Sequence, residues 1–353
     1  MTGLGVGFIG AGPVTQAIHL PALATMPEAF HTAHVMDVDQ VLAERVASRA
    51  GDGVTASTDY RKLLDDPAVD VVAVCSPHQF HAEQVAAACA AGKRAVLCEK
   101  PLATTAEEAA LIADAVTRSG VPVVVGTMHA YDPAWRAARE SWGDFASSVT
   151  LVRSAIYIPH NDEFIGLATE LAAPPGPLPP RGDMSDPRVR AAVLRGGILG
   201  LAIHNTPLVR QLLPEVDEVL DARPVAPFGY RITFRGGPRT AHLLALMPGQ
   251  WSPRWTFDAW SAEDHLHAEF PPSYVLAGSS VTEFGGRRWH LPANGYQAEW
   301  IHLADVAAGV AEPLFSIEDS VADLRYALAI ADGAADILAT DLVATNLVKK
   351  GQA

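Results

Sequence analysis

Short apolar runs alternate with amphipathic segments along the first 130 residues of the chain. The run VDVVAVCS at 69–76 is apolar almost throughout, which is typical of a strand covered on both faces. The segment DQVLAERVASRA at 39–50 instead has apolar residues at helical spacing. Strict alternation of the two patterns indicates parallel strands joined by right-handed crossovers, which is a doubly wound α/β sheet. The predicted strands are 5–10, 33–38, 54–57, 69–76, 94–99 and 121–128.

The pattern changes after about residue 145. The sequence FRGGPRT at 234–240 is typical of a hairpin turn. Strand-like segments follow one another there, separated by turn signals, and we expect no helices between them. This pattern predicts an antiparallel sheet and a second domain of α+β type. Its predicted strands are 148–158, 218–226, 230–237, 239–249, 254–262, 264–272 and 281–291.

A glycine-rich turn follows the first predicted strand and opens the first predicted helix. Gly10, Gly12 and Thr15 stand at the glycine positions of the dinucleotide motif G-x-G-x-x-G. Gly10 permits the tight turn, Gly12 lets the backbone approach a pyrophosphate, and the helix N-terminus offers free N–H groups. Thr15 replaces the third glycine, which weakens only the expected helix–strand packing. The residues we assign to the phosphates are Gly10, Gly12, Pro13 and Val14.

An acidic residue ends the second predicted strand. The carboxylate of Asp37 can accept hydrogen bonds from both ribose hydroxyls and would repel a 2′-phosphate. We therefore predict a dinucleotide site that prefers NAD, with NADP possible. The alternative is that Asp37 merely caps the helix that follows.

Composition narrows the class of protein. With 353 residues the chain exceeds one comfortable core, which favours two domains. A net charge of -14 does not favour binding to the negatively charged backbone of a nucleic acid. We expect no membrane segment, because no apolar run reaches about 18 residues, and no signal peptide, because the N-terminus lacks a basic region. An odd number of cysteines (Cys75, Cys89 and Cys98) favours free thiols in a reducing cytoplasm.

One lysine occupies an unusual position. The chain has 26 lysines and arginines together, of which only Lys62, Lys93, Lys100, Lys349 and Lys350 are lysines. Lys100 directly follows an apolar strand. Ligands of parallel sheets bind beyond the carboxyl ends of the strands, and lysine, unlike arginine, can lose its proton when desolvated. The plainer interpretation is a surface salt bridge.

The chain resembles the Gfo/Idh/MocA family, which is named after glucose–fructose oxidoreductase, inositol dehydrogenase and a rhizopine-catabolism protein. The resemblance rests on GFIGAG, VDVVAVCSPHQFHAE, CEKPLA, VGTMHAYDPAW, RGGILGLAIH and the late helical stretch. It implies an N-terminal Rossmann domain at 1–130 and a C-terminal α+β domain at 131–353 with a large open antiparallel sheet. It also implies that the last helices pack back on the Rossmann domain, sugar or cyclitol substrates, and a homodimer or homotetramer formed through that sheet.

The resemblance assigns roles to several residues. Lys100 would contact the substrate oxygen beside the nicotinamide, and Glu99 would position it. Ser76, Pro77 and His81 would border the nicotinamide ribose. Hydride transfer needs no metal, and we expect no metal site at His78 and His81, because no third ligand is spaced nearby.

His204 matches the histidine of the family's D-x-G-x-H segment, and the resemblance makes it the general acid–base beside Lys100. Without the resemblance it would be interpreted as a core histidine. Gly200 stands where the family often has aspartate, and we expect positions 200 and 204 to share one face of a helix. His129, Tyr131 or Asp132 could take over the aspartate's part, and Asn205, next to His204 in the sequence, is a further substrate candidate.

These assignments predict an NAD(P)-dependent oxidoreductase that transfers a hydride to or from a ring carbon of a sugar, cyclitol or glycoside-like compound. Two alternatives stay open. One is a glycosidase- or lyase-type enzyme that retains NAD and oxidises its substrate transiently. The other is a non-catalytic dinucleotide-binding regulator. The Pro-rich segment 172–183, expected to be a loop, has no assigned role.

Overall fold

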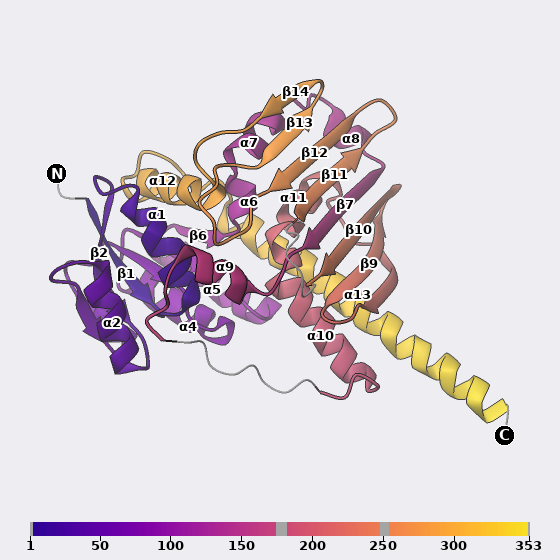
Figure 1. Ribbon diagram of the computed structural model, residues 1–353, viewed down its shortest axis with the longest axis horizontal. Coiled ribbons are helices and arrows are strands. Elements are labelled where there is room, and N and C mark those ends of the chain that lie inside the picture. The colour runs from indigo at the N-terminus through magenta and orange to yellow at the C-terminus, as the bar shows by residue number, and fades with distance from the viewer. Residues whose placement is uncertain (1–2, 174–181, 248–253, 352–353) are drawn as a thin grey trace.

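The computed structural model describes residues 3–173, 182–247 and 254–351, with side chains described as far as residue 339. Its N-terminal part contains a six-stranded parallel sheet in the order β3-β2-β1-β4-β5-β6 (Figure 1). This is the doubly wound order expected for a Rossmann domain, and the prediction of that fold is confirmed. The strands are β1 (Leu4–Ile9), β2 (Phe30–Met36), β3 (Thr55–Ser57), β4 (Val71–Val74), β5 (Ala95–Glu99) and β6 (Val123–Gly126).

Helices cover both faces of this sheet, which explains why β4 is buried at every position. Short polar side chains fix where the helices begin: the carboxylate of Asp39 accepts from the N–H groups at the start of the second helix. Gly120, with φ +70°, ends the last one. The helical segments are η1 (Thr15–His19), α1 (Leu20–Ala24), α2 (Gln40–Ala50), α3 (Tyr60–Asp65), η2 (His78–Phe80), α4 (His81–Ala90) and α5 (Ala106–Ser119).

The C-terminal part is built on an eight-stranded sheet in the order β14-β13-β12-β11-β7-β10-β9-β8. Neighbouring strands are antiparallel except β7 and β10, which pair in parallel. The predicted hairpin at 234–240 is confirmed as the β9–β10 turn. The strands are β7 (Leu151–Tyr157), β8 (Glu218–Pro224), β9 (Gly229–Gly236), β10 (Arg239–Leu246), β11 (Arg254–Trp260), β12 (His265–Phe270), β13 (Val281–Phe284) and β14 (Arg287–Trp289).

Two expectations for this part were wrong. Helices do interrupt the strands, because the long connection from β7 to β8 contains α9 (Asn161–Ala168), α10 (Pro187–Gly200), η3 (Ala202–His204) and α11 (Thr206–Leu212). Asp186 caps α10 and Pro187 opens it, a helix start that the strand-based interpretation overlooked. The segment 281–291 is also a hairpin, because Gly285 and Gly286 adopt positive φ between β13 and β14.

The remaining helices connect the two parts. The short helices α6 (Met128–Tyr131), α7 (Pro133–Arg139) and α8 (Phe145–Ser148) follow β6. Helix α12 (Gly295–Ala307) contacts β5 and β6, and its Trp300 packs edge-on against Phe8 and Phe30 of the parallel sheet. The long C-terminal helix, α13 (Ile317–Gly351), contacts α5 on one side and α10 and β8 on the other (Figure 1).

Helices cover one face of the second sheet and leave the other open. Along β9, Tyr230, Ile232 and Phe234 are buried whereas Arg231 and Arg235 are exposed, as expected of a sheet with one packed face. Across the described parts of the chain, no helix combines the length and apolarity needed to cross a membrane. Of the Pro-rich segment, residues 174–181 lie outside the described residues.

Candidate active site

The glycine-rich turn has the geometry of a phosphate-binding loop. Gly10 has φ +105°, and a Cβ there would lie 2.7 Å from the carbonyl oxygen of Cys75, so glycine is required by both conformation and space. A Cβ at Gly12 would find no atom of the described residues within 4 Å, which leaves its backbone open to a ligand. Thr15 is fully buried and donates a 2.6 Å hydrogen bond to the carbonyl oxygen of Gly10. The threonine therefore ties the helix to the loop where a third glycine was expected.

Asp37 faces this loop. One of its carboxylate oxygens accepts a hydrogen bond from the N–H of Ala11 at 2.9 Å, and the other accepts from the N–H of Asp39 at 3.0 Å. The N-cap of α2 is Asp39, so the alternative that Asp37 merely caps that helix is wrong. Each Asp37 oxygen keeps lone-pair capacity, and the half-buried carboxylate stands beside the phosphate loop where a ribose would lie.

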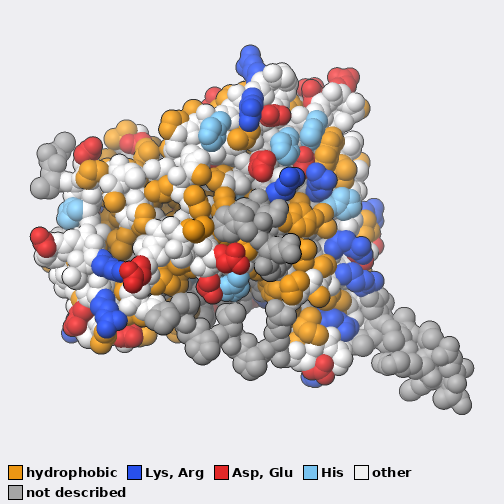
Figure 2. Space-filling model, viewed as in Figure 1, with side chains coloured by type: hydrophobic (Ala, Val, Ile, Leu, Met, Phe, Trp, Pro, Cys, Tyr) orange, Lys and Arg blue, Asp and Glu red, His pale blue; other side chains and the backbone are white. Residues whose placement is uncertain are grey.

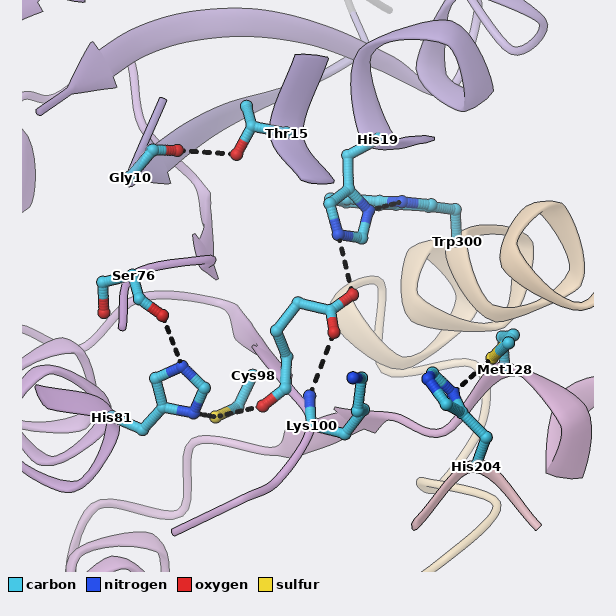
Figure 3. Close-up of polar contacts among 11 residues, drawn as sticks. Gly10, Thr15, His19, Ser76, His81, Cys98, Lys100, Met128, His204 and Trp300 are labelled. Atoms are coloured by element: carbon cyan, nitrogen blue, oxygen red, sulfur yellow. Dashed lines mark hydrogen bonds and ion pairs between the residues drawn. The ribbon is translucent and has the colours of Figure 1, made fainter. Parts of the chain in front are cut away.

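His81 links the segments that follow β4 and β5 through hydrogen bonds. Its Nε2 lies 2.9 Å from the carbonyl oxygen of Ser76, after β4 (Figure 3). Its Nδ1 lies 2.8 Å from the carbonyl oxygen of Pro101, after β5. The ring is fully buried, so His81 holds the ends of β4 and β5 together inside the protein. The hydroxyl of Ser76 donates to Gln84 at 2.5 Å, and Pro77 is exposed at the start of η2.

Glu99 lies in a buried hydrogen-bonded chain that no motif in the sequence indicated. Its carboxylate accepts from Nε2 of His19 at 3.0 Å and from the N–H of Lys100 at 3.1 Å. Trp300 donates to Nδ1 of His19 at 3.1 Å, and because Trp only donates, this nitrogen of His19 carries no proton. Burial alone would raise the pKa of Glu99, but the hydrogen bond from His19 and the charge of Lys100 hold it below its ordinary value.

Lys100 reaches from the end of β5 toward the second domain. Its Nζ donates a 2.9 Å hydrogen bond to the carbonyl oxygen of Gly200. Burial lowers the pKa of the ammonium, and the nearby Glu99 carboxylate opposes that effect. The lysine is therefore desolvated and bonded across the domain boundary, unlike a surface salt-bridge residue.

Lys100 and His204 border one pocket (Figure 3). Its volume is about 60 Å³, room for several water-sized groups. Val14 of the phosphate loop forms part of the same wall, so the pocket adjoins the expected cofactor path. The pocket is lined by residues of both sheets' domains, among them Val14, Glu99, Lys100, Gly200, His204, Trp255, Ser273, Tyr274 and Tyr296.

His204 is buried, and its Nδ1 lies 3.0 Å from the sulfur of Met128. Since a thioether only accepts, Nδ1 carries the proton and Nε2 is left as the basic nitrogen. Burial, together with the charge of Lys100 and the neighbouring His129, holds the pKa of His204 well below its ordinary value. The imidazole is therefore neutral near pH 7, as a proton acceptor must be.

The expected shared helical face of positions 200 and 204 was wrong. Helix α10 ends at Gly200, and His204 closes the separate turn η3. The α-helical hydrogen bonding ends with α10, and residues 202–204 form a tighter 3₁₀ turn, so the two positions do not share one helical face. A Cβ at Gly200 would meet nothing in the described part of the chain within 4 Å. A side chain at position 200 would therefore meet no clash at its Cβ.

None of the four substrate candidates lines this pocket. His129 bonds Asn205 at 2.6 Å and stacks on Phe270, and burial lowers its pKa to about 3. Asn205 in turn donates to Ser154 at 2.8 Å. This pair supports the wall behind His204, whose ring lies 5.8 Å from that of His129.

Asp132 and Tyr131 have structural contacts as well. The carboxylate of Asp132 caps α7 and accepts from the N–H and hydroxyl of Ser280 at 2.7 Å. Tyr131 is buried against Phe315 and borders a separate small cavity behind Lys100. The sequence analysis missed two residues that line the pocket, Tyr274 in a loop and Tyr296 on α12. Neither lies in a sequence motif that would have indicated a site.

Comparison with known proteins agrees with this geometry. Residues 4–127 match the GFO_IDH_MocA family, described as an oxidoreductase family with an NAD-binding Rossmann fold. Levoglucosan dehydrogenase of Pseudarthrobacter phenanthrenivorans is 36% identical over 146 residues, covering 40% of this chain and 37% of that protein. Inositol 2-dehydrogenase 2 of Saccharopolyspora erythraea is 38% identical over 133 residues, covering 37% and 38%. The matched part thus spans less than two fifths of these curated relatives.

Solved structures extend the likeness in fold to almost the whole chain. A levoglucosan dehydrogenase in complex with NADH and levoglucosan superposes with a TM-score of 0.71 at 21% identity, covering 95% of this chain and 98% of that one. A putative myo-inositol dehydrogenase from Sinorhizobium meliloti gives 0.68 at 19% identity, covering 94% and 98%. Residues 4–127 are therefore similar to the NAD-binding Rossmann domain of this oxidoreductase family, and the solved structures show that almost the whole chain shares the fold.

Proposed function

We propose that this protein is an NAD-dependent oxidoreductase that interconverts a secondary alcohol and a ketone on a ring carbon of a sugar- or cyclitol-like substrate. One observation carries the proposal: a desolvated ammonium, Lys100, and a neutral imidazole, His204, border the same pocket beside a phosphate loop. Dehydrogenation of an alcohol needs a group that takes the hydroxyl proton and a group that stabilises the charge that develops on oxygen.

The residues of the Rossmann domain fit the dinucleotide. The open backbone at Gly12, the strained turn at Gly10 and the start of η1 form a cradle for a pyrophosphate. Asp37 would accept from the adenosine ribose, which favours NAD over NADP. NAD, when bound, supplies the hydride acceptor for alcohol oxidation and the hydride donor for the reverse reaction.

His204 and Lys100 have different roles in the proposed reaction. Nε2 of His204 takes the hydroxyl proton during oxidation and returns it during reduction. Nζ of Lys100 donates to the same oxygen and stabilises its negative charge. Gly200 contributes only a carbonyl group, which fixes Nζ through its hydrogen bond but takes no proton.

The substrate class rests on the relatives and on the chemistry of the pocket. Two relatives are named for levoglucosan and inositol, which are ring compounds rich in hydroxyl groups. The hydroxyl of Tyr274 and the ring of Trp255 line the same pocket, and such side chains suit the polar edge and apolar face of a sugar ring.

We also propose that the protein is cytoplasmic and forms a homodimer or homotetramer through the open face of the second sheet. The three cysteines are free, as a reducing compartment favours. The open face, which carries Arg231 and Arg235 on β9, leaves a broad surface for a second copy. Light scattering coupled to size-exclusion chromatography tests this: a monomer at micromolar concentration would contradict it.

The functional experiment is a spectrophotometric assay for reduced nicotinamide with NAD or NADP and a panel of cyclic polyols and anhydro-sugars. We expect turnover with NAD on at least one ring polyol, and a loss of about 100-fold or more in kcat for Lys100→Ala. Lys62→Ala, on an exposed position of α3, is the matched control. Full activity of Lys100→Ala would contradict the proposal, as would turnover by protein that retains NAD and needs no added cofactor.

A further inference from the structure

A compact cluster of potential metal ligands lies on the open face of the second sheet, away from the pocket. Asp258 on β11 stands directly opposite His267 on β12, and His265 lies two residues before His267 on the same strand. Residues two apart on a strand share a face, so both imidazoles lie on the same side as the carboxylate. In Figure 2, histidine side chains gather with acidic and basic ones over the region of β11 to β14.

Two of the three separations between donor atoms are close to those in a coordination polyhedron. One oxygen of Asp258, Oδ1, lies 2.8 Å from Nδ1 of His267 and 3.1 Å from Nε2 of His265. The three ligand atoms all lie within 4.8 Å of one another. Around a tetrahedral zinc ion with bonds of about 2.0–2.1 Å, neighbouring ligand atoms stand roughly 3.3 Å apart. Only small movements would place an ion between them.

Neighbouring side chains hold these donors in place. Arg153 on β7 donates to the other Asp258 oxygen at 2.9 Å, which orients the carboxylate and leaves Oδ1 for a ligand. Trp260 stacks on the His265 ring with a centroid separation of 4.8 Å and an interplanar angle of 2°. The guanidinium of Arg153 lies over Trp260 in turn. The site is therefore ordered before any ion binds.

The cluster is also accessible. Asp258 is buried, whereas the side chains of His265 and His267 are 45% and 32% exposed. Both imidazoles border an open depression that Glu283 on β13 also lines. In the single chain, an ion can therefore reach both imidazoles from solvent.

We propose that Asp258, His265 and His267 form a binding site for a divalent transition-metal ion of the zinc type. Two imidazoles and one carboxylate suit Zn²⁺, Co²⁺ or Ni²⁺, whereas Mg²⁺ and Ca²⁺ prefer oxygen ligands alone. Hydride transfer needs no metal, so the site is independent of the proposed function. Its effect is to stabilise the sheet by cross-linking β11 and β12.

Protons compete with the ion. The charged groups around the imidazoles are Asp258 and Arg153 from the neighbouring strands, Glu269 on the same strand, and Glu283 opposite His267. Metal binding requires neutral imidazoles, so protons and the ion compete for His265 and His267.

The test uses tag-free protein treated with chelator and then dialysed. Isothermal titration with Zn²⁺ should give one ion per chain, and Co²⁺ should give the visible absorption bands of a four-coordinate site. The double variant His265→Gln/His267→Gln should lower the affinity for Zn²⁺ by at least about tenfold. His242→Gln is the matched control and should bind as the unmodified protein does. His242 lies on β10, which β7 separates from β11, and bonds Thr233 of β9.

Thermal unfolding provides a second readout, because an ion that binds only the folded state raises Tm. We expect Zn²⁺ to raise the Tm of the unmodified protein and of His242→Gln, and to leave the Tm of the double variant unchanged. No binding, or equal binding by the double variant, would overturn the proposal. NAD-dependent turnover by the double variant separates this outcome from a failure of the proposed function.

Discussion

The ammonium of Lys100 donates a 2.9 Å hydrogen bond to the backbone carbonyl of Gly200, which joins the end of β5 to the end of α10. The resemblance to the Gfo/Idh/MocA family places an aspartate at this position. A carbonyl oxygen fixes the lysine as well as a carboxylate would, but it carries no charge and accepts no proton. Lys100 therefore relies on Glu99 for electrostatic support, and burial lowers its pKa.

Restoring the acid at position 200 tests this relationship. A Cβ at Gly200 would meet no described atom within 4 Å, so the backbone there accepts a side chain without a clash at its first atom. A carboxylate beside the ammonium raises the pKa of Lys100. The alkaline limb of the kcat profile, where the lysine loses its proton, should therefore move to higher pH. Gly200→Asn is the isosteric neutral control; an identical shift in that variant would contradict the explanation.

The neutral state of His204 leads to a second prediction. Its pKa lies well below the ordinary value because of burial and the charge of Lys100. The proton-accepting form therefore persists below pH 6, and NMR titration should show no protonation of His204 near pH 6.5. Replacing Lys100 with Met removes the positive charge and should raise the pKa of His204. A ring that titrates at its ordinary pKa in the unmodified protein would exclude this electrostatic account.

Removal of the imidazole itself gives the matching kinetic result. His204→Asn should lower kcat by about 10²–10⁴-fold, the usual contribution of a general acid–base, with little change in the affinity for NAD. His31→Asn, at an exposed position of β2, serves as control. A parallel loss of cofactor affinity would indicate that the variant has disturbed the fold instead.

The sequence predicts the N-terminal domain well because its signals are local. Unbroken apolar strands, the Gly10 turn and the position of Lys100 at a strand end follow from patterns a few residues long. Several features of the site instead depend on long-range contacts. His19 and Trp300 meet although they are 281 residues apart, and neither stands in a motif. The Met128 contact to His204 likewise joins residues 76 positions apart.

The errors have local physical causes too. Positions 200 and 204 were expected on one helix, but the helical spacing of the apolar residues does not reveal the 3₁₀ turn that begins after Gly200. Asp132 was a substrate candidate because its segment follows a Rossmann strand, and Asn205 was a candidate that adjoins His204 in the sequence. Both side chains are buried and hydrogen-bonded to other protein groups. These bonds join residues far apart in the sequence, so local sequence patterns do not indicate them.

We predict that the preference for NAD over NADP depends on Asp37. Its carboxylate accepts from Ala11 and Asp39 and stands where a 2′-phosphate would carry like charge. Asp37→Ser removes both the ribose acceptor and the repulsion. We expect the ratio of kcat/KM for NAD to that for NADP to fall by at least about tenfold. An unchanged ratio would place the ribose elsewhere.

The buried Glu99 connects stability to pH. Its folded-state pKa lies below the ordinary value, so the carboxylate contributes stability above the unfolded pKa of about 4.5 that is lost as the pH falls through the folded pKa. Glu99→Gln cannot make that contribution, and should unfold more easily at pH 7 by about 1–3 kcal/mol. The difference between the two proteins in urea unfolding should narrow as the pH is lowered below 4.5. A difference that stays constant with pH would contradict the assignment.

The most direct test is a crystal structure of the protein with NAD and a ring polyol that it oxidises. The account predicts the reacting hydroxyl within hydrogen-bond distance of both Nζ of Lys100 and Nε2 of His204, with the nicotinamide ring against the same pocket. A substrate or nicotinamide bound on another surface, with these two nitrogens facing neither, would contradict it.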